Sequence, residues 1–189
     1  MAKRFYELHV AGCTRQLPVL NISDTLAIAG FVILGDTDIV VRCSKELAEK
    51  IPKDTDVIMT AETKGIPLAA EMARILGMKR YVVARKSVKA YMENPIWVED
   101  ESITTAGKQR LYLQDADIEL MKGKNVLLVD DVISTGGSMK AMKRLSWPKA
   151  TPPGERILSI WLRCPCLTQR SKREENAIFQ FVELLGIGG

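Results

Sequence analysis

Two adjacent carboxylates and a run of small residues occur together in the segment VLLVDDVISTGGS, residues 126–138. Four apolar residues, expected to form a buried strand, lead into Asp130 and Asp131. Adjacent residues of a strand point to opposite faces of a sheet, so these two carboxylates are not expected to form a side-by-side acid pair. At least one of them should face a ligand crevice, where it could accept hydrogen bonds from sugar hydroxyls or from metal-bound water.

The small residues that follow the two aspartates are suited to bind a phosphate group. They are Ser134, Thr135, Gly136, Gly137 and Ser138. Glycines let the backbone approach an anion, and the start of the helix expected here offers free N–H groups and a positive dipole end. The segment does not match the GxxxxGK[ST] loop that binds nucleoside triphosphates. A site for a diol beside a site for a phosphate suggests a ribose 5-phosphate; the alternative is a capped helix after a glycine turn.

The elements that would position these residues alternate between strands and helices. Continuous apolar runs predict strands at residues 57–60, 81–84, 126–129 and 157–162. Helical spacing of apolar residues predicts helices around 68–76 and 141–145. This order indicates an α/β fold with a doubly wound, mostly parallel sheet and helices on both faces. Ligands bind at the carboxyl ends of the strands in such folds, and both small-residue loops lie there.

The segment that precedes this sheet is expected to contain further short elements. The runs Phe31–Leu34 and Ile39–Val41 are rich in β-branched residues and are predicted to be strands around a turn. Ser44 would then cap a short helix over Lys45–Ile51, which Pro52 would end.

Two other segments lack a clear regular pattern. Residues 87–117 are polar and irregular apart from an alternation around Leu111 and Leu113, and loops of this length are usually functional or disordered. Near the C-terminus, Trp147-Pro148 and the prolines after it are expected to break the helix directly after Leu145.

The composition fits one globular domain with a substantial core. The 189 residues are 47% hydrophobic and 26% charged, and the net charge of +4 suits an anionic ligand without deciding its nature. No apolar run approaches the roughly 20 residues of a membrane helix, and residues 1–12 lack the apolar core of a signal peptide. We therefore expect a cytoplasmic protein with no membrane contact and reduced cysteines. A single histidine, His9, argues against most Ser–His and Cys–His catalytic schemes.

The segment VLLVDDVISTGGS resembles the phosphoribosyl-pyrophosphate (PRPP) binding motif of the type I phosphoribosyltransferases. Two other segments agree with this resemblance. AETKGIP (61–67) is similar to the pyrophosphate-binding loop of adenine phosphoribosyltransferases, and ARKS (84–87) is similar to their basic segment at the end of the next strand. The resemblance is clear from about residue 39 to residue 145, and it is closest to the adenine and other purine phosphoribosyltransferases.

This resemblance implies a role for each matching residue. Asp130 and Asp131 would be the catalytic carboxylates that hold the ribose hydroxyls, and residues 134–138 would cradle the 5-phosphate. Pyrophosphate would bind to the following residues: Thr63, Lys64, Arg85, Lys86 and Lys89. The metal would be Mg²⁺ with no direct protein ligand, held mainly by substrate oxygens and water. Residues 87–109 would form a mobile loop that closes over the site.

The activity that the resemblance implies is transfer of the 5-phosphoribosyl group from PRPP to a purine base, giving a nucleoside monophosphate and pyrophosphate. Adenine is the favoured base, with xanthine or hypoxanthine/guanine as alternatives. A homodimer is also implied. The alternative from another class is a PRPP-sensing, non-catalytic transcriptional regulator. Fewer than forty residues precede the core and they show no helix-turn-helix pattern, so we do not expect nucleic-acid binding.

The base would be selected by a small hood over the core. The whole chain, 1–189, is expected to be a single domain in which residues 1–35 and about 164–189 form the hood and residues 36–163 form the core. Asn21 and Phe31 are the candidate base-binding residues, by hydrogen bonding and stacking respectively. A surface strand and helix start is an equally good interpretation of the segment that contains them.

Overall fold

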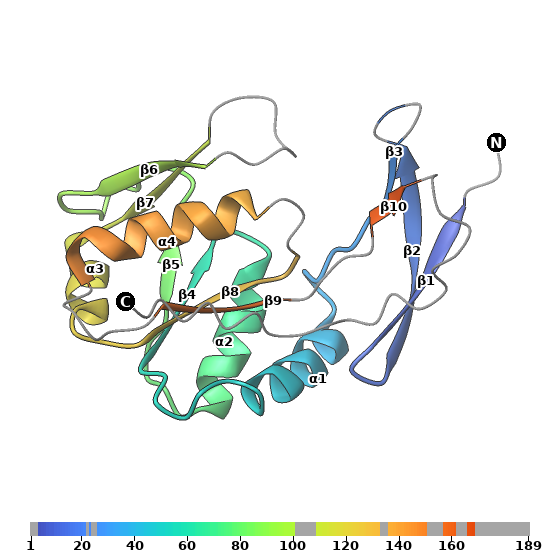
Figure 1. Ribbon diagram of the computed structural model, residues 1–189, viewed down its shortest axis with the longest axis horizontal. Helices are drawn as coiled ribbons and strands as arrows, with labels where there is room; N and C mark the ends of the chain where they lie inside the picture. The colour runs from blue at the N-terminus through green and yellow to red at the C-terminus, as the bar shows by residue number, and fades with distance from the viewer. Residues whose placement is uncertain are drawn as a thin grey trace, which may run out of the picture.

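The main sheet of the protein consists of four parallel strands in the order β5-β4-β8-β9 (Figure 1). The computed structural model describes residues 4–21, 23, 26–100, 109–132, 136–150, 157–161 and 166–168. The strands are β4 (Val57–Ala61), β5 (Val82–Ala84), β8 (Val126–Asp130) and β9 (Ile157–Trp161). Every residue of β4 and β8 is buried, which explains their continuous apolar sequences.

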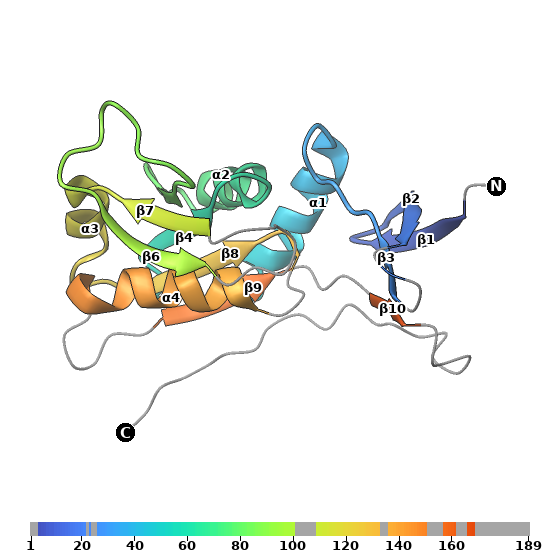
Figure 2. The same cartoon turned by 90° about the horizontal axis from the view of Figure 1, so that it is seen from above.

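Helices cover both faces of this sheet, as predicted. Helices α1 (Thr37–Ala48) and α2 (Gly65–Ile75) lie on one face, and α4 (Gly137–Ala150) lies on the opposite face (Figure 2). The short helix α3 (Asp115–Met121) packs with α4. Successive strand residues divide between the two cores: Ile58 packs with α1 and α2, whereas Met59 packs with α3 and α4. The predicted doubly wound α/β architecture is thus confirmed.

An antiparallel hairpin joins the edge of the main sheet at the end of β5. Its strands are β6 (Ile96–Asp100) and β7 (Gln109–Leu113). Tyr112 and Arg85 exchange two backbone hydrogen bonds of 2.8 and 2.9 Å, which connect the hairpin to the sheet. The expectation that residues 87–117 are irregular is wrong for β6, β7 and α3, and residues 87–95 form no helix or strand, as expected. The alternating Leu111 and Leu113 of β7 are fully buried against the main sheet. Residues 101–108 of the expected mobile loop lie outside the described residues.

A second sheet of four antiparallel strands lies beside α1 (Figures 1 and 2). Its strands are β1 (Phe5–Val10), β2 (Cys13–Asn21), β3 (Leu26–Ala29) and β10 (Cys166–Thr168). The two-residue turn between β1 and β2 has positive φ at both Ala11 and Gly12, as tight hairpin turns require. Leu8 and Leu17 of this sheet are buried in the same core as α1 and α2.

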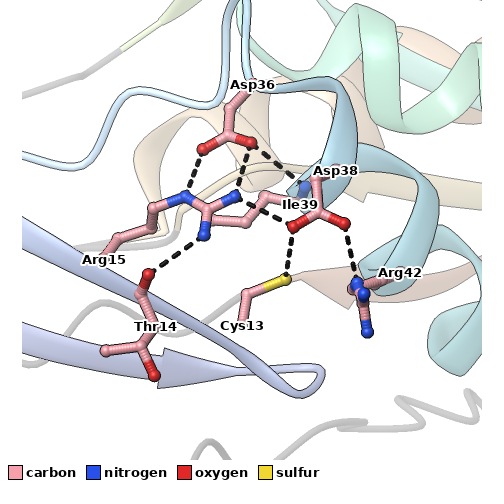
Figure 3. Close-up of polar contacts among 7 residues, drawn as sticks. All are labelled: Cys13, Thr14, Arg15, Asp36, Asp38, Ile39 and Arg42. Carbon is pink, nitrogen blue, oxygen red and sulfur yellow. Dashed lines mark hydrogen bonds and ion pairs between the residues drawn. The ribbon is translucent and has the colours of Figure 1, made fainter.

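Polar contacts fix the second sheet to the N-terminal end of α1 (Figure 3). Arg15 on β2 donates to Asp36 through Nε at 2.7 Å and through NH2 at 2.9 Å. Asp38 accepts from Arg15 NH2 at 3.1 Å, from Arg42 Nε at 2.7 Å and from the Cys13 thiol at 3.3 Å. The contacts of Cys13 and Arg15 with Asp36 and Asp38 link residues that are 21 to 25 positions apart in the sequence.

The prediction of two strands around a turn at residues 31–41 is wrong. Ile39–Val41 belongs to α1, and Phe31–Leu34 forms no strand. Asp36 is the N-cap of α1, and its carboxylate accepts the Ile39 N–H at 3.2 Å. The β-branched residues favoured a strand locally, but the burial of Ile39, Val40, Cys43 and Leu47 gives this segment the spacing of an amphipathic helix.

The predicted helix caps and ends also need correction. Ser44 does not begin a helix; it lies inside α1, and its hydroxyl donates to the Leu68 carbonyl of α2 at 3.3 Å. Helix α4 does not stop after Leu145 but runs through Pro148 to Ala150. Proline is unfavourable within a helix, but Pro148 lies in the final turn of α4 and does not end it. Within the ranges that the structure describes, no helix is long and apolar enough to cross a membrane.

Candidate active site at the strand ends

Asp130 and Asp131 lie at the carboxyl end of β8, one of the two central strands of the main sheet. Their exposed fractions are 9% and 7%, so both carboxylates are largely buried. The Asp131 N–H donates to Asp130 Oδ1 at 2.9 Å, which fixes the orientation of the Asp130 carboxylate. Asp130 is the last residue of the strand, and Asp131 is the first residue beyond it.

The electrostatic environment of these two carboxylates disfavours their charged forms. Burial, followed by the charge of Asp131, raises the pKa of Asp130. Burial also raises the pKa of Asp131. The two side chains interact with each other, so the expectation that they do not form a side-by-side pair is wrong. The charges of Lys86 and Lys64 oppose these shifts only in part, at Asp130 and Asp131 respectively. Such a pair would be stabilised by hydroxyl donors or by a nearby cation, both of which a ribose with its bound metal would bring.

The N-terminus of α2 approaches this acidic pair very closely. A Cβ atom on Gly65 would collide with Thr60 Oγ1 and would stand 3.4 Å from both Asp130 Oδ1 and the Val129 carbonyl oxygen. Glycine is therefore required here, because any side chain would push α2 away from the strand ends. The Thr60 side chain is fully buried, and its hydroxyl has no hydrogen-bond partner among the described residues.

The loop between β4 and α2 carries the predicted pyrophosphate-binding residues Thr63 and Lys64. Lys64 is the N-cap residue of α2 and makes no side-chain capping bond. The peptide bond between Glu62 and Thr63 is cis. The N-terminus of α2, at the end of this loop, lies close to Asp130, and its free N–H groups and positive dipole end suit an anion.

The basic segment at the end of β5 lies next to that loop. Arg85 Nε is 3.3 Å from Glu62 Oε2, in an ion pair that lacks the geometry of a hydrogen bond. The Lys86 N–H donates to the same carboxylate oxygen at 2.8 Å, and this bond, more than the charge of Arg85, lowers the pKa of Glu62. Lys89 also acts on Glu62 by its charge, while its ammonium donates to Ser87 Oγ at 2.6 Å. The structure thus brings these cations to the same edge of the sheet as Asp130.

The predicted 5-phosphate loop is described in part. Gly136 has a φ of +75°, a backbone conformation that glycine adopts without strain. Helix α4 begins at Gly137, and the Lys140 N–H donates to the Gly136 carbonyl at 2.9 Å. Ser138 lies in the first turn of α4. Ser134 and Thr135 lie outside the described residues.

The two candidate base-binding residues lie on the second sheet or shortly after one of its strands. Asn21 ends β2, is exposed, and accepts a hydrogen bond from Arg4 at 2.9 Å. Phe31 follows β3 and is only 9% exposed, within the core that contains α1 and α2. Their proposed contacts with a base remain predictions.

Three residues that the sequence did not single out as site residues belong to this arrangement. They are Thr60, Glu62 and Gly65. Glu62 and Gly65 lie in the segment AETKGIP, which was compared with a pyrophosphate-binding loop, but no individual role was predicted for either residue. Nothing in the local sequence marks Thr60, because its contact with Gly65 depends on how closely α2 packs against the sheet.

The described residues include no group of three or more His, Cys, Asp or Glu side chains that could hold a metal ion. The carboxylates of Asp130 and Asp131 can face a cation at this edge, whereas the Glu62 carboxylate contacts Arg85 and Lys86. Two buried carboxylates with raised pKa values fit a hydrated divalent cation that the substrate holds and the protein contacts only weakly.

The family of this fold and site is identified by comparison with known proteins. The phosphoribosyl transferase domain family matches residues 34–146, more than half of the sequence. The chain belongs to this family. The match begins just before α1 and ends near the end of α4, so it includes all three segments that form the strand-end site.

Two curated relatives are named as phosphoribosyltransferases for different purine bases. A hypoxanthine/guanine phosphoribosyltransferase of Methanothermococcus okinawensis is 43% identical over 102 residues, covering 52% of this chain and 51% of that protein. An adenine phosphoribosyltransferase of Thermotoga petrophila is 38% identical over 93 residues, covering 49% and 51% respectively. The chain thus spans about half the length of the curated relatives it matches.

Solved structures of adenine phosphoribosyltransferases share the fold. The enzyme from Saccharomyces cerevisiae, complexed with an imino-altritol bisphosphate and adenine, aligns with a TM-score of 0.53 at 23% identity. That alignment covers 67% of this chain and 69% of the yeast chain. The enzyme from Thermoanaerobacter pseudethanolicus aligns with a TM-score of 0.51 at 21% identity, covering 67% and 80%.

Proposed function

We propose that the protein is a purine phosphoribosyltransferase that transfers the 5-phosphoribosyl group from PRPP to a purine base. The observation that carries this proposal is the buried Asp130–Asp131 pair, which lies between a glycine-rich helix start and a second anion-suited loop. One loop suits a phosphate and the other suits a pyrophosphate, and a ribose would fill the space at the acidic pair between them.

The proposed reaction is a displacement at the anomeric carbon of ribose. A ring nitrogen of the base forms the new bond to this carbon and loses its proton to solvent, while the bond to pyrophosphate breaks and its electron pair leaves with the pyrophosphate oxygen. The transition state carries positive charge on the sugar, and the Asp130 and Asp131 carboxylates would stabilise this charge and orient the hydroxyls. Thr63, Lys64, Arg85, Lys86 and Lys89 would bind the departing pyrophosphate.

When bound, magnesium would neutralise charge on the departing pyrophosphate. In this proposal, substrate oxygens and water hold the ion, and the carboxylates of Asp130 and Asp131 contact its hydration shell. The backbone of Gly136 and Gly137, with the hydroxyls of Ser134, Thr135 and Ser138, would hold the 5-phosphate.

The base is proposed to be adenine, with hypoxanthine/guanine or xanthine as alternatives. Support for a purine comes from the names of the relatives, which include both adenine and hypoxanthine/guanine enzymes. The sheet β1-β2-β3-β10 is the proposed hood, formed by residues 1–35 and about 164–189 over the core of residues 36–163. Asn21 and Phe31 remain its proposed base-binding residues. A homodimer and a cytoplasmic location complete the proposal.

A screen of purine bases tests the proposed function. The purified protein is incubated with PRPP, Mg²⁺ and one base at a time, and released pyrophosphate is measured. We expect release with one purine in preference to the others, together with the matching nucleoside monophosphate. Failure to form a nucleotide with adenine, hypoxanthine, guanine or xanthine would exclude the proposal.

A regulatory function is the second candidate, and one comparison favours it. A probable purine biosynthesis transcriptional regulator PurR of Streptococcus pneumoniae is 27% identical over 129 residues, covering 65% of this chain and 46% of that protein. A regulator would bind PRPP without forming a nucleotide, and its binding to DNA would respond to PRPP. Measuring DNA binding with and without PRPP separates this candidate from the enzyme.

A further inference from the structure

Glu62 lies where the chain leaves β4 and turns toward α2. Its backbone N–H donates to the Ala84 carbonyl at 2.8 Å, which extends the parallel pairing of β4 with β5. The next bond of a regular parallel ladder would run from the Lys86 N–H to the backbone carbonyl of Glu62. Here the Lys86 N–H donates instead to Oε2 of the Glu62 side chain, at 2.8 Å. The side chain thus takes the place of its own carbonyl, and the backbone is released to form the loop.

The same carboxylate also holds the basic segment of the site. Its Oε2 atom lies 3.3 Å from Arg85 Nε, and that nitrogen is buried. Because one oxygen contacts both Arg85 and Lys86, the start of the loop 62–64 and the segment 85–86 are held at a fixed separation. These are the two segments that we propose bind pyrophosphate.

We propose that Glu62 is a positioning residue that sets the spacing of the two halves of the pyrophosphate-binding surface. This inference rests on the proposed function. A carboxylate would repel a pyrophosphate that it touched, so Glu62 acts through its neighbours and not by contact with substrate. Its main task is to accept the Lys86 N–H, while the ion pair with Arg85 is secondary because it lacks hydrogen-bond geometry.

Two substitutions separate the hydrogen bond from Lys86 from the ion pair with Arg85. Glu62→Gln retains a side-chain oxygen that can accept the Lys86 N–H, whereas Glu62→Ala removes the acceptor. Glu119→Ala is the matched control, because it also removes a glutamate from an ion pair, with Lys122 on the exposed surface of α3. Thermal unfolding of each variant verifies that it is folded.

Binding of pyrophosphate and of PRPP in the presence of Mg²⁺ is then measured by titration calorimetry. We expect Glu62→Ala to weaken both affinities about tenfold or more, and Glu62→Gln to stay within about threefold of wild type. The KM for the base should change in neither variant, since the pyrophosphate side of the site alone is affected. Wild-type affinity in Glu62→Ala would overturn the inference, as would an equal loss in Glu62→Gln and Glu62→Ala.

Hydrogen exchange of the Lys86 amide, followed by NMR in the free protein, tests the geometry without any ligand. We expect exchange to be slow in wild type and Glu62→Gln, and about tenfold faster or more in Glu62→Ala. Unchanged exchange in Glu62→Ala would overturn the inference. If wild-type protein binds neither PRPP nor pyrophosphate, the proposed function fails, and the inferred pyrophosphate role of Glu62 fails with it. If wild type binds both and Glu62→Ala binds equally well, only the inference fails.

Discussion

Arg15 and Asp36 join the antiparallel sheet to the main body of the protein through two hydrogen bonds of 2.7 and 2.9 Å. Asp36 is at the same time the N-cap of α1, whose first turn it stabilises by accepting the Ile39 N–H. One carboxylate therefore determines both where α1 begins and where β2 docks against it. This relationship predicts that the two functions of Asp36 can be separated by substitution.

Asp36→Ala should lower the free energy of unfolding by about 1–2 kcal/mol, since it removes the helix cap together with the acceptor of Arg15. Asp36→Asn should cost less, because asparagine caps helices well and only the charge facing Arg15 is lost. Urea unfolding of the two variants and wild type provides the comparison. Equal stability of the alanine variant and wild type would show that Asp36 has neither role.

The lowered pKa of Asp38 predicts that the protein loses stability in acid. Hydrogen bonds from Arg42, Arg15 and Cys13 lower its pKa to about 2. A carboxyl whose pKa is lower in the folded state stabilises the fold above its unfolded pKa of about 4. This contribution is lost as the pH falls from about 4 to 2. Urea unfolding across this pH range should show a shallower pH dependence for Asp38→Asn than for wild type; identical slopes would contradict the assignment.

The raised pKa of Asp130 predicts the opposite dependence of stability on pH. Burial raises its pKa, so the folded state is penalised as the pH rises from about 4 through the raised folded-state pKa. Asp130→Asn should therefore be more stable than wild type at pH 7.5, by about 1 kcal/mol or more, since one pKa unit corresponds to about 1.4 kcal/mol. The difference should disappear near pH 4. A variant less stable than wild type at pH 7.5 would contradict this account of the site.

The close approach of α2 to the strand ends predicts a compensating pair of substitutions. Gly65→Ala should destabilise the protein by about 1–3 kcal/mol, because the new methyl group would collide with Thr60 Oγ1. Removing that hydroxyl in Thr60→Ala should restore part of the loss in the double variant. A double-mutant cycle from urea unfolding measures the coupling. Strictly additive effects would mean that the two residues do not contact each other.

The parts of the fold that follow from local sequence were predictable. Strands β4 and β8 are buried on both faces, so their sequences are continuously apolar, and α2 lies where apolar residues at helical spacing predicted a helix. The segment Ile39–Val41 was misassigned because its β-branched residues favour a strand, and only packing against α2 makes it helical. The hairpin β6–β7 was missed for a related reason, since its stability depends on burial of Leu111 and Leu113 by α4 and the main sheet.

The candidate site likewise contains residues that could be predicted from the sequence and contacts that could not. Asp130, Asp131, Arg85 and Lys86 could be selected from their positions after apolar runs, because the ends of parallel strands meet at one edge of the sheet. The contacts of Glu62 with Lys86 and of Gly65 with Thr60 could not, because they depend on side-chain geometry across elements. No periodicity in the sequence reports the distance between α2 and β8.

The central claim is that Asp130 and Asp131 hold the ribose of PRPP during transfer to a purine. The most direct test is the initial rate of nucleotide formation by Asp130→Asn/Asp131→Asn, compared with wild type and with the exposed surface variant Glu119→Gln. We predict a loss of at least about 100-fold in kcat/KM for PRPP in the double variant, with a folded and stable protein, and an unchanged rate in Glu119→Gln. Full activity of the double variant would contradict the account.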